Sequence, residues 1–402
     1  ALREHARDAI ISPSGTAFAP PSKLRGVLPR MLQELLATRA MVKRAMKSHT
    51  AQRDRALYRA LNARQMGLKL IANVTYGYTS ASFSGRMPCA EIADSIVSFG
   101  RRTLERAIAM VEGNPEWNAK VVYGDTDSMF VLLPGRDRLE AHAIGHEMSK
   151  AVTGANPPPV ELKFEKVYQP CILASKKRYV GYMYETALPT ERPKFDAKGI
   201  ETVRRDGCGA CRVAVEGAIR ALFAANDVSA AKRYVREQAS LILRGRCALE
   251  QLVFAKEVKL GSYASPPPAA VVAYRAMAID RRAEPPRGER VRFVVCWGAP
   301  GSNLVDRCFD PRDVALSRGA LRPCGQYYVD KVIVPALQRS LGLLGCDVSS
   351  WLADMPREVP TVLPAATAAA ACSCLPVALP WSCRTSALPA EPATQRQYRH
   401  PA

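Results

Sequence analysis

Two aspartates near the middle of the chain have the spacing of a cation site. Asp125 and Asp127 are separated by one residue, Thr126, within residues 121–132, VVYGDTDSMFVL. The flanking β-branched and aromatic residues predict a β-hairpin whose tight turn carries both acids. If Thr126 is extended, both carboxylates point to one side, and at about 4 Å they repel by several kcal/mol. Bound Mg²⁺, which prefers carboxylate oxygens and substrate phosphates, would relieve this repulsion. The alternative is a surface turn that uses Gly and Asp for the backbone alone.

The composition predicts an acidic partner. The 402 residues include 57 Lys and Arg against 37 Asp and Glu, a net charge of +20. This length predicts two or three domains. Nucleic acid is the first candidate partner and an anionic membrane surface is the alternative. The sequence contains no apolar run of about 18 residues that could span a bilayer. The 12 Cys are scattered, which favours reduced thiols, and Cys208 with Cys211 forms a CxxC without a second pair.

A helix is predicted over residues 27–47 from the spacing of its apolar residues. On another face Arg39, Lys43 and Lys47 recur every four residues and form a basic stripe. A solvated surface is the alternative explanation for this stripe.

A second helix is predicted over residues 53–76 after a short polar turn, which favours antiparallel packing of the pair. Lys69, Asn73 and Tyr76 are spaced by four and three residues, so they share one face. A Lys suits a triphosphate, an Asn can donate to phosphate or sugar oxygens, and a Tyr ring can pack against a base.

The following segments alternate between helix and strand. A helix over residues 91–112 is predicted to bury the apolar side chains Ile92, Ile96, Phe99, Leu104, Ile108 and Val111. Residues 139–152 form another predicted helix, and residues 162–168 and 171–185 two strands. The second strand contains the tetrad Lys176, Lys177, Arg178 and Tyr179. Alternation along a strand would send Lys177 and Tyr179 to one face, and Lys176 and Arg178 to the other.

Three stretches in this order resemble motifs of family B DNA polymerases. They are KLIANVTYGY beginning at Lys69, YGDTDS around Asp125, and KKRY beginning at Lys176. The resemblance covers residues 10–355. The strings FAKE at 254–257 and GERV at 288–291 agree with the zeta branch of the family, which performs translesion synthesis.

The resemblance implies an α+β fold with a partial palm containing an antiparallel sheet, two-helix fingers and a mostly helical thumb. The implied domains are a loop remnant of the palm at 1–26, fingers at 27–76, palm at 77–205, thumb at 206–355 and a disordered low-complexity tail at 356–402. Helices are predicted within the thumb at 211–226, 228–246 and 325–345, and a strand at 290–297.

The implied reaction is template-directed nucleotidyl transfer with two Mg²⁺ ions. Asp125 and Asp127 are the catalytic residues and metal ligands, and Glu165 is a further carboxylate near the metals without a direct bond. The implied nucleotide-binding residues are Arg39, Lys43, Lys69, Asn73 and Tyr76. The implied DNA-binding residues are Lys176, Lys177, Arg178, Tyr179, Lys198, Arg204 and Arg205. Lys177 and Tyr179 are expected to approach the primer. An unspecialised basic loop is the alternative for residues 195–205.

The implied partners are primer–template DNA, deoxynucleoside triphosphates and polymerase accessory subunits, in the nucleus. The family's first palm motif, an Asp followed by SLYPS, has no match in residues 1–26, so we expect a fragment with little or no activity alone that lacks upstream polymerase domains. The tail cysteines Cys372, Cys374 and Cys383 lack the spacing of the family's metal or iron–sulfur motifs, so no cluster is predicted. The alternative function is a non-catalytic DNA-binding clamp derived from a polymerase.

Overall fold

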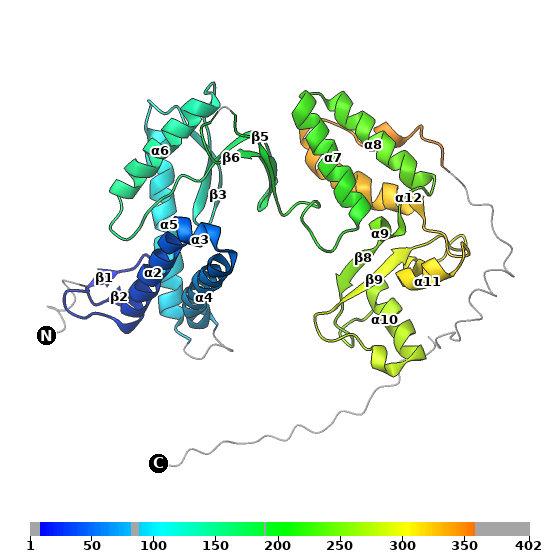
Figure 1. Cartoon of the computed structure of the whole chain (residues 1–402), viewed down its shortest axis with the longest axis horizontal. Helices are drawn as coiled ribbons and strands as arrows, with labels where there is room; N and C mark the ends of the chain where they lie inside the picture. Colours follow the sequence, from blue (N-terminus) through cyan, green and yellow to red (C-terminus); the bar gives the residue numbers. More distant parts are fainter. Residues whose placement is uncertain (1–8, 82–87, 189, 358–402) are drawn as a thin grey trace, which may run out of the picture. The chain divides into compact units, whose positions relative to one another are not determined.

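The computed structural model describes residues 9–81, 88–188 and 190–357. The chain divides into two compact units, drawn in Figure 1. The first comprises residues 1–169 and 183–194, and the second comprises residues 170–182 and 195–402. No helix in the described part combines the length and apolar character needed to cross a membrane. Residues 358–402, which make up nearly all of the predicted tail and contain its cysteines, lie outside the described residues.

The first unit contains five described helices and two small hairpins. Its helices are α2 (Val27–Ala45), α3 (His49–Arg53), α4 (Arg55–Ser80), α5 (Ala90–Gly113) and α6 (Arg138–Gly154). Its strands are β1 (Ile10–Ile11), β2 (Ala17–Phe18), β3 (Lys120–Asp125) and β4 (Ser128–Leu132). Strand β1 pairs with β2, and β3 pairs with β4, both antiparallel.

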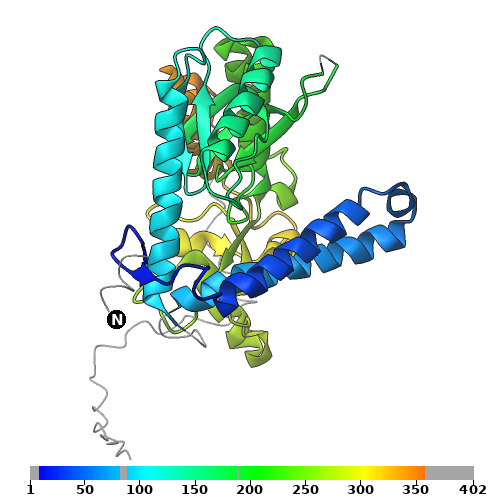
Figure 2. The same ribbon diagram turned by 90° about the vertical axis from the view of Figure 1, so that its left-hand side faces the viewer.

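Helices α2 and α4 form the predicted pair, seen as two long neighbouring helices in Figure 2. The connection contains the short helix α3, where the sequence predicted a polar turn alone. Asp54 begins α4 as its N-cap, because its side chain accepts hydrogen bonds from the backbone N–H groups of Ala56 (2.8 Å) and Leu57 (3.0 Å). Helix α4 extends to Ser80, one turn beyond the predicted end.

Helices α5 and α6 cover one face of the β3–β4 hairpin. Their core contains the buried side chains Ala107, Val111, Trp117, Met148 and Val152, with Val121, Met129 and Val131 packed against it from the hairpin. The prediction was wrong for Ile96 and Phe99, which are 48% and 38% exposed. This part of α5 instead buries Ser95, whose hydroxyl lies 3.1 Å from that of Ser12.

The second unit is mostly helical, as predicted for residues 206–355. Its helices are α7 (Gly209–Ala225), α8 (Val228–Leu243), α9 (Leu249–Leu252), α10 (Pro268–Ile279), α11 (Pro311–Leu316), α12 (Gly325–Tyr327), the π-helix η3 (Tyr328–Ile333) and α13 (Val334–Leu341). Helices α7 and α8 pack closely: a Cβ added at Gly217 would lie 2.1 Å from the ring of Tyr234. Tyr328 is fully buried, donates to the Leu252 carbonyl at 2.7 Å and accepts from the Val295 N–H at 2.9 Å.

Two three-stranded sheets complete the described structure. The first has the order β5-β6-β7, with β5 (Val167–Ser175), β6 (Arg178–Tyr184) and β7 (Lys194–Lys198). The second has the order β10-β9-β8, with β8 (Phe254–Glu257), β9 (Arg290–Val295) and β10 (Cys308–Phe309). Only β9 was predicted in this second sheet, because β8 and β10 are too short to show periodicity.

The predicted strands at 162–168 and 171–185 were wrong in their boundaries. Strand β5 begins at Val167, and residues 161–166 belong to no strand. The segment predicted as one strand contains the end of β5, a turn at Lys176 and Lys177, and all of β6. Lys177 adopts a φ of +61°, which ends strand geometry. The alternation argument for the basic tetrad therefore does not apply.

Candidate functional site

A β-bulge decides which way the first aspartate of the hairpin points. Val121 pairs with Val131, but Tyr123 pairs with Phe130, so Val122 is an extra residue in β3. Without it, strict alternation from the core-facing Val121 would direct Asp125 toward helices α5 and α6. The bulge reverses the faces, because Asp125 pairs with Ser128 on the same face as Phe130. The carboxylate of Asp125 thus lies on the face opposite the helical core.

The turn between the strands differs from the prediction. Thr126 has a φ of +59° and is therefore left-handed, whereas the sequence argument required it to be extended. This conformation is rare for a β-branched residue and places strain next to both acids. The turn closes with a 2.6 Å hydrogen bond from the Asp127 N–H to the Asp125 carbonyl. Asp125 is half-buried and Asp127 is exposed, and the two remain adjacent at the tip.

Aromatic side chains flank Asp125 on its face of the hairpin. The rings of Tyr123 and Phe130 lie 5.7 Å apart, and Tyr168 stacks on Phe130 at 5.6 Å. Lys166 lies 5.3 Å from the Tyr168 ring. This stack holds the segment after α6 beside the hairpin. Glu165, the further predicted carboxylate, lies in this segment and is exposed.

The donor set at the turn suits Mg²⁺ held jointly by protein and substrate. In the described part of the chain, no group of three or more His, Cys, Asp or Glu side chains could hold a metal ion. Two carboxylates are present at the turn, and Mg²⁺ is usually bound by one or two carboxylates, phosphate oxygens and water. Asp125 and Asp127 fit that requirement.

The predicted nucleotide-binding residues all lie on the two paired helices α2 and α4. Arg39 on α2 donates from Nε to Oε1 of Gln65 on α4 at 3.4 Å, so these two residues lie level. Lys69 is four residues beyond Gln65, about 6 Å along the axis. Lys43 lies one turn from Arg39 in the opposite direction, so Lys43 and Lys69 are separated by about 12 Å along the pair. Arg39 and Lys69 are thus neighbours, and Lys43 is more distant.

The polar face of α4 is open to solvent. Lys69, Asn73 and Tyr76 are all exposed, with Tyr76 at 40%. Because they lie within one continuous helix, their shared face follows from the helical repeat. The same unit therefore carries the acidic turn and this polar helix face.

The basic tetrad lies at the β5–β6 turn of the second unit. Lys176 and Lys177 form the turn and are exposed, whereas Arg178 and Tyr179 begin β6 and are half-buried. The guanidinium of Arg178 is held by Glu201, with Nη2 at 2.7 Å from Oε1 and 2.8 Å from Oε2. Arg178 is thus engaged within the protein.

The remaining predicted DNA-binding residues lie at the end of β7 or shortly after it in the same unit. Lys198 lies 3.4 Å from Asp196, and Arg204 donates to both carboxylate oxygens of Asp206 at 3.0 and 2.8 Å. The hydrogen bond and charge of Arg204 lower the pKa of Asp206 despite its partial burial. Arg205 is exposed.

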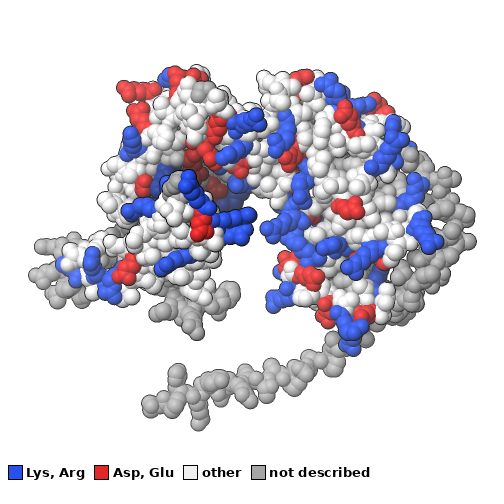
Figure 3. All heavy atoms as spheres, viewed as in Figure 1, with Lys and Arg blue, Asp and Glu red and all other residues white. Residues whose placement is uncertain are grey.

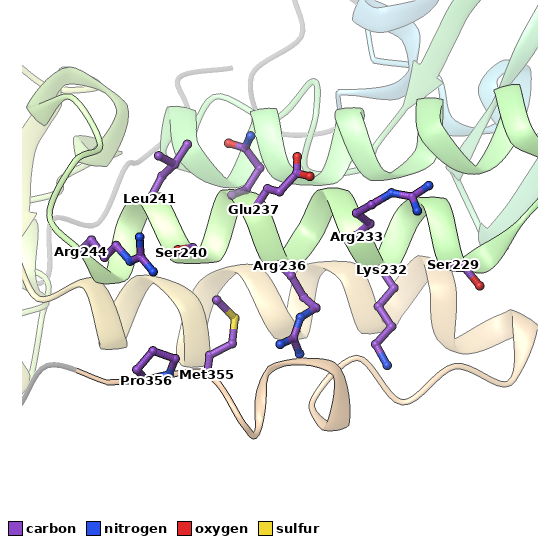
Figure 4. Close-up of a pocket in the computed structure, with 11 residues that line it drawn as sticks. Ser229, Lys232, Arg233, Arg236, Glu237, Ser240, Leu241, Arg244, Met355 and Pro356 are labelled. Carbon is purple, nitrogen blue, oxygen red and sulfur yellow. The ribbon is translucent and has the colours of Figure 1, made fainter.

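Sequence reasoning missed a basic groove along α8. A cavity of about 730 Å³ lies between α8 and the segment around Met355 and Pro356, with the labelled side chains shown in Figure 4. Its basic lining residues are Lys232, Arg233, Arg236 and Arg244. Lys232, Arg233 and Arg236 lie within about one turn of α8, and Arg244 is its C-cap, so the spacing of the first three was the available signal. On the face shown in Figure 3, basic side chains are spread over both units with acidic ones between them.

The CxxC pair lies in the hydrophobic core of the second unit. Cys208 and Cys211 are both buried at the start of α7, and burial raises the pKa of Cys208 to about 11 and that of Cys211 to about 12. Burial thus disfavours the thiolate form, which is the form that binds metals.

Comparisons with known proteins identify the family. The model of DNA polymerase family B matches residues 2–342. A DNA polymerase zeta catalytic subunit of Arabidopsis thaliana is 53% identical over 352 residues, which cover 86% of this chain and 18% of that protein. The corresponding Homo sapiens protein is 52% identical over 354 residues, covering 87% and 11%. The chain thus spans less than a fifth of the length of these two relatives.

A solved structure supports the fold. The family B DNA polymerase from the hyperthermophilic archaeon Pyrobaculum calidifontis matches with a TM-score of 0.55 and 24% identity, over 84% of this chain and 41% of that one. The predicted α+β class is confirmed by this neighbour and by the mixture of helices and small antiparallel sheets. The chain belongs to DNA polymerase family B, with zeta catalytic subunits among its relatives.

Proposed function

We propose that this chain is the fingers, partial palm and thumb of a zeta-like, DNA-directed DNA polymerase that acts in translesion synthesis. The observation that carries the proposal is the bulged hairpin, which directs Asp125 away from the helical core and keeps Asp127 next to it. A surface turn with no chemical role would have no need of a bulge that turns an acid outward, or of a strained Thr126. Membership of DNA polymerase family B supports the proposal independently.

Asp125 and Asp127 are the proposed ligands of the Mg²⁺ ions. When bound, the two ions activate the primer 3′ hydroxyl and stabilise charge on the triphosphate and the departing pyrophosphate. The protein holds its two carboxylates at the end of a paired hairpin, so their separation changes little during the reaction. Glu165 is proposed to stay near the ions without a direct bond.

The α2–α4 pair is proposed to bind the incoming nucleotide. Lys69 and Arg39, one helical turn apart in level, offer an ammonium and a guanidinium to the triphosphate. Lys43 lies further along the pair and adds to the positive field. Asn73 can donate a hydrogen bond from its amide, and the exposed ring of Tyr76 offers a surface for the nascent base pair.

The second unit is proposed to hold the primer–template duplex. Lys176 and Lys177 at the β5–β6 turn, with Tyr179 beside them, would contact the primer. Lys198, Arg204 and Arg205 would contact the phosphate backbone, which fixes register without reading sequence. Arg178 acts indirectly, since Glu201 already holds it.

Activity is proposed to require further palm residues. The Asp-SLYPS motif of the family has no match in residues 1–26, and a site with only Asp125 and Asp127 lacks one metal-bridging carboxylate. We therefore propose that the 402-residue chain alone has little or no polymerase activity and works with upstream polymerase domains. Accessory subunits and a nuclear location are part of the same proposal.

Primer extension tests the proposal. The chain is joined to the upstream palm region of a zeta catalytic subunit, and Asp127→Asn is compared with Asp94→Asn, an exposed acid on α5. Asp127→Asn should lower extension by more than about 100-fold, while Asp94→Asn leaves it unchanged. Extension by Asp127→Asn at the parent rate would overturn the proposed role. Measurable extension by the 402-residue chain alone would overturn the proposed dependence on upstream residues.

The second candidate function is a non-catalytic DNA clamp. The net charge of +20 and the basic groove on α8 are expected of such a clamp as much as of a polymerase. Primer extension by the joined chain separates the two. A polymerase extends the primer and loses this activity in Asp127→Asn, whereas a clamp binds the duplex without extension; duplex affinity should stay unchanged or rise slightly in Asp127→Asn under either function. If the joined chain binds duplex DNA but never extends a primer, the clamp is the correct function.

A further inference from the structure

One half-buried carboxylate joins three separate parts of the second unit. Glu201, just after β7, is 14% exposed and accepts four hydrogen bonds from two guanidinium groups. Arg178 donates from Nη2 to both oxygens, and Arg339 on α13 donates from Nε (3.0 Å) and Nη2 (2.7 Å) to Oε1. The two arginines are 23 and 138 residues away in sequence. Glu201 therefore ties the start of β6 to helix α13.

The backbone makes a second contact at the same place. Gly199 has a φ of +65°, and a Cβ added to it would lie 2.2 Å from the carbonyl oxygen of Lys177. Lys177 itself has a φ of +61°, which is uncommon for a lysine. The segment 199–201 thus touches the turn at Lys177 through Gly199 and grips the next residue, Arg178, through Glu201. The same short segment therefore contacts two consecutive residues at the end of the turn.

The charges at this contact are unequal. One carboxylate faces two guanidinium groups, and Nε of Arg178 is buried with no hydrogen-bond partner in the described structure. Removing the carboxylate would leave two like charges close together, one of them partly buried. We expect Arg178 to swing outward and the turn to lose its fixed position.

We propose that Glu201 is a positioning residue, which presents Lys176 and Lys177 to the primer terminus by fixing the β5–β6 turn against α13. This inference rests on the proposed contact between that turn and the primer. In this inference Arg178 and Arg339 stabilise the turn, because both guanidinium groups bind the Glu201 carboxylate. Helix α13, far away in sequence, thereby becomes part of the primer-binding structure.

The test uses the sign of the change in DNA affinity. Glu201→Gln and the control Glu284→Gln each remove one negative charge from the second unit, and Glu284 is exposed. General electrostatics predicts that both bind DNA equally or more tightly. Positioning predicts that Glu201→Gln binds a recessed 3′ end about three- to tenfold more weakly, while its affinity for blunt duplex changes little. Fluorescence anisotropy with both DNAs on the 402-residue chain gives the comparison.

Two further variants keep the test decisive if Glu201→Gln folds poorly. Arg339→Gln removes the α13 anchor and leaves the Arg178–Glu201 contact, so it should give part of the same loss. Glu201→Asp should restore part of the affinity. Faster hydrogen exchange at residues 175–179 in Glu201→Gln and Arg339→Gln is the expected structural counterpart.

The outcomes separate the inference from the proposed function. If the parent chain shows no preference for a recessed 3′ end, the proposed primer contact fails and the inference falls with it. If the parent shows the preference and neither Glu201→Gln nor Arg339→Gln reduces it, the positioning role alone is overturned. Tighter binding of the recessed end by Glu201→Gln would mean that the freed arginines bind DNA directly, which also overturns it.

Discussion

Replacing Thr126 by glycine tests whether the acidic turn stores strain. At a φ of +59° an L-residue carries a penalty of about 1–2 kcal/mol, which glycine does not. Glycine costs about 0.5–1 kcal/mol more in backbone entropy on folding. It also loses the exposed 3.3 Å hydrogen bond from Thr126 Oγ1 to Asp125 Oδ1. Thr126→Val loses the same hydroxyl but remains β-branched, so it is the matched control.

The difference between the two variants isolates the strain. Thr126→Gly should make the hairpin about 0.5–1 kcal/mol more stable than Thr126→Val, equal to a two- to fivefold slower hydrogen exchange of the β3–β4 amides. In the joined polymerase, Thr126→Gly should nevertheless extend primers more slowly than Thr126→Val, because a glycine turn samples more arrangements of Asp125 and Asp127. Faster amide exchange in the glycine variant than in the valine variant would refute the strain argument.

Two further predictions concern stability. Burial lowers the pKa of His142 below its usual 6.5. The charge of Glu191 raises this pKa, and the charges of His146 and Arg138 lower it further. The first unit should therefore be fully stable above pH 6.5 and lose stability as the pH falls below it, and urea unfolding of His142→Phe should lack this dependence. For glycines, Gly217→Ala should destabilise α7–α8 by about 1–3 kcal/mol, whereas Gly67→Ala, with no atom within 4 Å, should stabilise α4 by about 1 kcal/mol. Equal urea midpoints for the two alanine variants would contradict the packing argument.

The sequence predicted the elements whose signals are local. The helix pair, α5 and α6 follow from apolar periodicity over many residues. The acidic hairpin follows from the β-branched and aromatic residues on either side of its turn. The face of Asp125 could not be predicted, because it depends on the single extra residue Val122 in the pairing register. The positions of Ile96 and Phe99 were wrong for a similar reason, since periodicity does not reveal which side of a helix its neighbours cover.

Long-range contacts account for the other differences. The left-handed conformation of Lys177 contradicts the preference of a lysine, and it accompanies the close approach of Gly199, 22 residues away. Glu201 was not singled out because an isolated Glu carries no signal, and its partners are distant in sequence. The motif YGDTDS identified the acids, but the geometry around them came only with the structure.

Mn²⁺ binding observed by NMR tests the central claim, that the turn at Asp125 and Asp127 binds divalent cations. In the 402-residue chain with primer–template DNA and a non-hydrolysable nucleotide, Mn²⁺ should broaden the amide signals of residues 123–128 first. The account predicts that Asp127→Asn weakens this broadening by about tenfold in Mn²⁺ concentration, while Asp94→Asn leaves it unchanged. Broadening centred elsewhere, or identical in Asp127→Asn and the parent chain, would contradict the account.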